Sequence, residues 1–155
     1  MKGNEQILKQ LNMRLAEELT AINQYTVHAE MCENWRYKRL HEMIFKRSIQ
    51  EMKHAEKLIA RILFLEGIPI VSELHKIHIG SEVQKMHSND HAAEVGAIRG
   101  YNESIRVAVE VGDNGSRELL EEILKDEEEH VDLIEAQLDQ ISQVGIQKYL
   151  AEQID

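Results

Sequence analysis

The tetrapeptides Glu51-Met52-Lys53-His54 and Glu127-Glu128-Glu129-His130 repeat the pattern Glu-x-x-His at an offset of 76 residues. Each has an earlier glutamate at the same distance, because Glu18 and Glu94 each precede their copy by 33 residues. Residues three apart lie on one face of a helix, about one turn apart, so the Glu and His of each copy can bind one metal ion together. The repeat therefore predicts two matching half-sites carried on four helices.

Four long segments carry apolar residues at intervals of three and four, the period of an amphipathic helix. The expected helices are residues 5–34, 35–66, 81–111 and 116–144, with a short fifth helix at 146–153. Gly67-Ile68-Pro69 ends the second helix, because glycine suits a helix C-cap and proline cannot continue the hydrogen-bond ladder. Ser81-Glu82-Val83-Gln84 has the form of a capping box and opens the third.

The connections between these helices differ in length, and this predicts the topology. Residues 112–115 form a tight turn, whereas residues 67–80 make the longest connection and lack helical periodicity. We expect this crossover to pack along the bundle as an extended strap. The fold class is therefore all-α: a four-helix bundle with a long crossover between helices two and three and a short C-terminal fifth helix, in a single domain of residues 1–155.

Composition excludes several classes of protein. A hydrophobic content of 43% supports a sizeable core, and a formal net charge of −10 argues against a nucleic-acid partner. No apolar run approaches the length of a membrane span, and the first residues lack the apolar stretch of a secretory signal. Cys32 is the only cysteine, so one chain forms no internal disulfide and no cysteine-based metal site. These features predict a cytoplasmic location.

Four glutamates and two histidines interrupt the apolar stripes, which places them facing the core. Such charges would suffer desolvation and mutual repulsion, and two divalent cations answer that charge problem directly. Carboxylate and imidazole ligands suit iron or manganese better than a thiolate-binding metal. The expected ligands are Glu18 and His54 for one ion, Glu94 and His130 for the other, and Glu51 and Glu127 as bridges.

A di-iron centre of this kind points to oxidation chemistry. Open coordination positions would admit dioxygen or peroxide, so the natural reaction is the oxidation of Fe(II) to Fe(III). Tyr25 lies two turns beyond Glu18 on the same stripe, where its hydroxyl is placed to hydrogen-bond a ligand or to supply an electron. The ordinary alternative is a core tyrosine whose hydroxyl is satisfied by a neighbour.

Over essentially its whole length the sequence resembles the bacterioferritins. The resembling stretches are Met1-Lys2-Gly3, residues 18–25, 51–56 and 61–67, Asp126-Glu127-Glu128-Glu129-His130, and Tyr149-Leu150. The resemblance implies a ferritin-like bundle that acts as a ferroxidase, with the six ligands named above unchanged. It also implies a hollow homo-oligomeric shell of twenty-four subunits, built of twofold dimers, which stores iron as a ferric mineral. A ferredoxin-type reductant for iron release is implied as well.

The resemblance further implies haem b between two subunits, with one methionine of each as an axial ligand, and the matching residue is Met52. Met52 follows Glu51 directly, so it points roughly 100° away from the di-metal face, toward a partner subunit. An ordinary interface methionine is the alternative.

Helix two departs from the family in one place. Bacterioferritins often carry a histidine and an aspartate on the cavity-facing side of this helix, implicated in passing iron or electrons inward. Here Lys46 and Gln50 take those positions, with Arg47 between them. We therefore expect no iron site on that inner surface and a different route for iron into the cavity.

Three other functions share part of this pattern. A rubrerythrin-like peroxidase has the helical duplication but usually adds a domain with paired Cys-x-x-Cys motifs, which this chain lacks. A DNA-protecting mini-ferritin builds its metal site between subunits and lacks the duplication within one chain. A helical bundle without metal would bury its charges uncompensated. Aerobic oxidation of Fe(II) and the size of the assembly discriminate among these functions.

Overall fold

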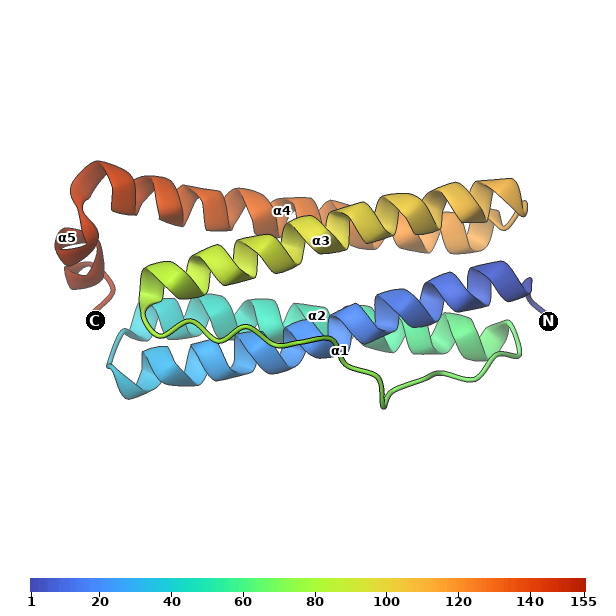
Figure 1. Ribbon diagram of the computed structural model, residues 1–155, viewed down its shortest axis with the longest axis horizontal. Coiled ribbons are helices and arrows are strands. Elements are labelled where there is room, and N and C mark those ends of the chain that lie inside the picture. Colours follow the sequence, from blue (N-terminus) through green and yellow to red (C-terminus); the bar gives the residue numbers. More distant parts are fainter.

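Five helices form in the computed structural model, which describes residues 1–155. They are α1 (Glu5–Asn34), α2 (Lys38–Phe64), α3 (Val83–Glu110), α4 (Asn114–Val144) and α5 (Ile146–Ala151). Figure 1 shows two antiparallel hairpins, α1 with α2 and α3 with α4, packed against each other. The crossover after α2 runs back along the bundle, so α3 starts beside the C-terminal end of α1 and the N-terminal end of α2. The predicted four-helix bundle with a fifth short helix is confirmed.

The helix ends differ from the predicted ones where the backbone turns sharply. Arg36 and Glu66 have φ of 66° and 60°, so α2 begins at Lys38 and ends at Phe64 rather than at residues 35 and 66. The expected capping box at Ser81 is wrong. The N-cap of α3 is Glu82, whose carboxylate accepts hydrogen bonds from the backbone N–H groups of Gln84 and Lys85. A carboxylate fits this position because it also meets the positive end of the helix dipole.

The apolar core divides into two clusters separated along the bundle axis. One contains Ile7, Leu11, Leu15, Leu58, Ile62, Tyr101, Leu120 and Ile123 among its members. The other contains Tyr25, Ala29, Leu40, Ile44, Met86, Ile141 and Tyr149. Each fully buried leucine or isoleucine contributes about 1.5–3 kcal/mol to folding. These two clusters lock the four helices on both sides of a buried polar layer.

The crossover lies extended along the bundle, as predicted, but polar side chains of α1 hold it there. Thr20 Oγ1 accepts a hydrogen bond from the backbone N–H of His75 at 2.9 Å, and Gln24 Oε1 accepts one from that of His78 at 3.1 Å. Most of the apolar side chains of the crossover remain exposed, and Ile68 is 81% exposed. The strap is therefore attached by hydrogen bonds to its backbone more than by burial of its isoleucines.

None of the five helices combines the length and the apolar character that crossing a membrane requires.

Candidate metal centre

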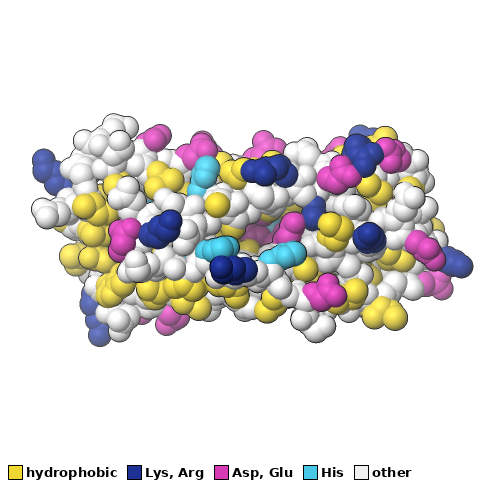
Figure 2. Space-filling model, viewed as in Figure 1, with side chains coloured by type: hydrophobic (Ala, Val, Ile, Leu, Met, Phe, Trp, Pro, Cys, Tyr) yellow, Lys and Arg dark blue, Asp and Glu magenta, His cyan; other side chains and the backbone are white.

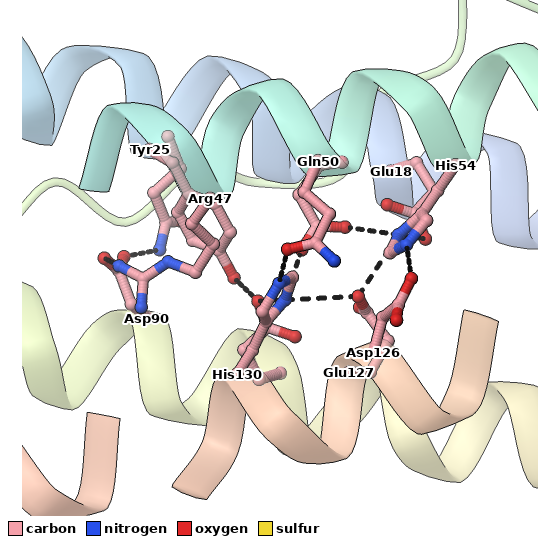
Figure 3. Close-up of polar contacts among 12 residues, drawn as sticks. Glu18, Tyr25, Arg47, Gln50, His54, Asp90, Asp126, Glu127 and His130 are labelled. Atoms are coloured by element: carbon pink, nitrogen blue, oxygen red, sulfur yellow. Dashed lines mark hydrogen bonds and ion pairs between the residues drawn. The ribbon is translucent and has the colours of Figure 1, made fainter. Parts of the chain in front are cut away.

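The six predicted ligand residues meet in the polar layer at the middle of the bundle. Their ligand atoms form two groups, each with all atoms within 4.8 Å of one another. The first group is Glu18, Glu51, His54 and Glu127, and the second is Glu51, Glu94, Glu127 and His130. Glu51 and Glu127 belong to both groups, which is the arrangement that the sequence predicts for bridging carboxylates. Helices α1 and α3 supply one glutamate each, and α2 and α4 supply the Glu-x-x-His pairs (Figure 3).

Several of the buried atoms that could bind a metal have no hydrogen-bond partner within the protein. They are Glu18 Oε2, Glu51 Oε1, Glu94 Oε2, Glu127 Oε1 and His130 Nδ1. His130 Nδ1 lies 2.9 Å from Glu51 Oε1, but the two atoms do not have the geometry of a hydrogen bond. Unpartnered buried polar atoms cost free energy, and carboxylate oxygens that converge on one point suit hard divalent cations. The donor set therefore fits a pair of iron ions.

Each histidine turns one nitrogen toward the glutamates and the other toward a residue of the facing helix. His54 Nδ1 lies 3.2 Å from Glu51 and 3.3 Å from Glu127. Its Nε2–H donates to Asp126 Oδ2 at 2.8 Å. The Nε2–H of His130 donates in the same way to Gln50 Oε1 at 2.7 Å. These outer hydrogen bonds fix both rings so that Nδ1 is the nitrogen free to bind metal.

Gln50 and Arg47 both turn toward the inside of the bundle. Gln50 is half-buried and holds His130, so it belongs to the metal centre as well as to the surface between α2 and α4. Arg47 is buried, and its Nη2 pairs with Asp90 Oδ2 at 2.8 Å. Its length lets it reach the core, so only Lys46 of the three stays on the exposed face.

Met52 is 41% exposed, on the side of α2 away from the metal centre.

Two tyrosines hydrogen-bond the glutamates of α1 and α3. The Tyr25 hydroxyl donates to Glu94 Oε1 at 2.7 Å, and the Tyr101 hydroxyl donates to Glu18 Oε1. Both tyrosines are fully buried. Sequence reasoning missed Tyr101 and treated it only as part of an apolar stripe. The signal was present in the sequence. Tyr101 lies 76 residues after Tyr25, and the same offset relates the candidate ligands of one half-site to those of the other.

Burial and mutual repulsion perturb the pKa values of the ligands. Burial, with Glu51 nearby, raises the pKa of Glu18 well above its usual range. Burial and the charge of Glu127 raise the pKa of Glu94 to about 7. Burial lowers the pKa of His130, but the close carboxylates of Glu127, Glu51 and Glu94, 2.9–3.3 Å from its Nδ1, outweigh burial and raise that pKa to about 12. Protons and metal ions thus compete for the same donor atoms, and metal binding releases protons.

Two cavities reach this layer from opposite faces. A cavity of about 440 Å³ is lined by α1, α3 and the crossover, with Glu18, Glu94 and Glu127 among its walls and His75 and His78 near its mouth. Figure 2 shows histidine and basic side chains in the middle of this face, around a hollow in which acidic side chains are visible. A second cavity of about 560 Å³ lies between α2 and α4 and is lined by Lys46, Gln50 and Asp126.

Comparisons with known proteins agree with this geometry. The family description "Ferritin-like domain" matches residues 8–144. Bacterioferritins from Brucella melitensis and Rhodobacter capsulatus are 39% and 40% identical, and each match covers 96% of this chain and 92% of the relative. A bacterioferritin from Mycobacterium tuberculosis is 37% identical over 98% of this chain and 96% of its own length.

Proposed function

Because the chain belongs to the bacterioferritin family, we propose that it stores iron and acts as a ferroxidase, oxidising Fe(II) at the centre of its own bundle. The observation that carries the proposal is the pair of overlapping donor groups that share Glu51 and Glu127. Fe(II) is the substrate and Fe(III) the product. With peroxide as oxidant, two Fe(II) ions give up one electron each, and the peroxide takes two protons and leaves as two water molecules.

The glutamates of the site favour the product of this reaction. Glu18, Glu51, Glu94 and Glu127 place four carboxyl groups around two adjacent positions, and their attraction grows as the charge of the iron rises from +2 to +3. The shared pair Glu51 and Glu127 keeps both ions within reach of one oxidant molecule. Tyr25 holds the Glu94 carboxylate by its hydrogen bond.

The cavity beneath the crossover is the proposed route for Fe(II) into the centre. It opens on the face that carries the strap, and three of the ligand glutamates form part of its wall. Carboxylates at the base of a cavity attract divalent cations, and low-dielectric walls strengthen that attraction.

The wider assembly follows from the family. We propose that copies of this chain form twofold dimers within a hollow shell of twenty-four, in the cytoplasm, and that a ferredoxin-type reductant serves iron release. Haem b would lie at the twofold axis, where the thioether of Met52 from each of two chains would supply an axial ligand. The residue fits this role, since its side chain is partly exposed and methionine sulfur is a known haem ligand.

Aerobic addition of Fe(II) to the purified protein tests the ferroxidase proposal. Ferric absorbance is expected to rise faster than in buffer alone, and Glu18→Ala or Glu127→Ala is expected to abolish the fast phase while the assembly keeps its size. Glu128→Ala is the matched control, because Glu128 neighbours Glu127 but is exposed. Equal rates for the wild type and Glu127→Ala would rule the centre out.

A separate measurement tests the haem. Protein purified after expression with sufficient haem is expected to show a Soret band, and Met52→Leu is expected to remove it without changing Fe(II) oxidation. A Soret band that survives in Met52→Leu would exclude Met52 as the axial ligand.

A further inference from the structure

The outer partners of the two histidines follow the same 76-residue repeat as the ligands. Gln50 precedes the bridging Glu51, and Asp126 precedes the bridging Glu127. Each reaches across to the histidine of the opposite helix: Asp126 on α4 accepts from His54 on α2, and Gln50 on α2 accepts from His130 on α4. Figure 3 shows the two contacts side by side. The contact is the same in both halves, but one acceptor is a carboxylate and the other is a neutral amide.

Each half also has one buried arginine that pairs with a carboxylate. Near Glu18, the buried Arg14 pairs with Glu17 at 2.9 Å. Near Glu94, the buried Arg47 pairs with Asp90 at 2.8 Å. Each tyrosine also has one of these guanidinium groups over its ring, Arg14 over Tyr101 at 6.0 Å and Arg47 over Tyr25 at 4.6 Å from the ring centroid.

The second cavity adds no charge that would favour one half. Besides Arg47 and the outer partner Asp126, its charged lining residues are Lys46, Lys53, Lys57 and Glu129, and these four are exposed, so solvent screens their charges. Between the two equivalent outer contacts, the difference is the negative charge of Asp126 against the neutral amide of Gln50.

We propose that the two metal positions are unequal, and that the position formed by Glu18 and His54 binds a divalent cation more tightly than the position formed by Glu94 and His130. A carboxylate that accepts the outer N–H of a ligating histidine makes that imidazole more basic and adds a negative charge close to the ion. Asp126 does this for His54, and the amide of Gln50 gives His130 orientation alone. Asp126 and Gln50 are thus positioning residues that set an order of loading. This inference rests on the proposed function, since it concerns the same centre.

Cobalt(II) is a suitable probe, because it stays divalent when the titration is kept free of dioxygen and its optical spectrum reports coordination. Titration of the assembled wild-type protein, followed by absorbance and calorimetry, is expected to show two steps of one ion per chain. Outer hydrogen-bond partners typically change metal affinity by about 10- to 100-fold, so the two steps are expected to differ by about that factor.

Two substitutions at the outer partners should bring the steps together from opposite directions. Gln50→Asp is expected to tighten the weaker step about tenfold or more and leave the tighter one in place. Asp126→Asn is expected to weaken the tighter step toward the other. Asp132→Asn removes the same charge from an exposed position of α4, and Gln140→Asp adds one there, so both are expected to keep the wild-type separation.

The outcomes separate this inference from the ferroxidase proposal. Two equal cobalt steps in a wild-type protein that still oxidises Fe(II) would overturn the inequality and leave the ferroxidase standing. An unchanged separation in Gln50→Asp, with helicity and assembly size intact, would overturn it as well. A protein that neither binds cobalt nor oxidises Fe(II) would overturn both.

Discussion

Tyr101 on α3 donates a buried hydrogen bond to Glu18 on α1. Tyr25 on α1 donates the corresponding bond to Glu94 on α3, so the two helices exchange one tyrosine–glutamate contact in each direction. In both glutamates the second oxygen has no hydrogen-bond partner in the protein. Each tyrosine therefore fixes one oxygen of a carboxylate and leaves the other available to a metal ion.

Removal of the Tyr101 hydroxyl should impair the metal centre. In Tyr101→Phe a buried carboxylate oxygen of Glu18 loses its donor, a change that costs about 1–3 kcal/mol. Because metal affinity depends on such outer contacts, we expect Fe(II) oxidation at limiting iron to slow by about tenfold, as in Tyr25→Phe. Tyr149→Phe is the matched control, since Tyr149 is a buried, hydrogen-bonded tyrosine outside the centre. An unchanged rate in Tyr101→Phe would show that Glu18 needs no such support.

Stability without metal should fall as the pH rises. Burial raises the pKa of Glu17 and of Glu94 to about 7 from an ordinary value of 4.5, so between these values the folded chain holds protons that the unfolded chain releases. Their contribution is complete below about pH 4.5 and is lost as the pH rises through about 7. Chelator-treated protein is therefore expected to have a lower melting temperature at pH 8 than at pH 5.5.

A substitution at Glu17 isolates part of this effect. Glu17→Gln should flatten the pH dependence without removing a candidate metal ligand, because it eliminates the raised pKa of Glu17 and leaves that of Glu94. Added Co(II) should reverse the slope at high pH, since metal binds the deprotonated donors. A melting temperature that rises from pH 5.5 to pH 8 in the chelated protein would contradict the raised pKa values.

Two glycines of α3 should respond oppositely to alanine. A Cβ atom at Gly100 would collide with the Arg14 guanidinium, which is buried and has little room to move, whereas a Cβ at Gly96 would meet nothing within 4 Å. We expect Gly100→Ala to reduce the free energy of unfolding by about 1–3 kcal/mol through overpacking. Gly96→Ala should increase it by about 0.5–1 kcal/mol through helix propensity. Urea unfolding of the two variants checks the pair, and equal effects would contradict the packing around Arg14.

The start of the crossover should loosen when Asn12 is shortened. The Asn12 side chain donates to the Ile68 carbonyl at 3.1 Å and accepts from the Ile70 N–H at 2.9 Å. In Asn12→Ala we expect faster hydrogen exchange at Ile70 and a loss of about 0.5–1.5 kcal/mol for each hydrogen bond. The amides of His75 and His78, bound to Thr20 and Gln24, should keep their protection. Equal loosening along the whole strap would show that it moves as one unit.

Much of this protein follows from short-range patterns in its sequence. The bounds of α1, and the inward face on which each Glu-x-x-His pair and each partner glutamate lies, follow from residues one or two helical turns away, because spacing alone determines which face of a helix a side chain occupies. The burial of Glu18 and Glu94 follows in the same way from the apolar stripes that they interrupt.

Only the tertiary structure decided which side chains meet across helices. The rotation and axial shift of one helix against another bring Tyr101 to Glu18, Arg47 to Asp90 and Gln50 to His130. The tertiary structure also decided the attachment of the crossover, which α1 holds by hydrogen bonds to the strap backbone while most of the strap's apolar side chains stay exposed. Helical periodicity specifies the face of a residue but not its partner, because long side chains such as arginine and glutamine reach neighbours that no local spacing encodes.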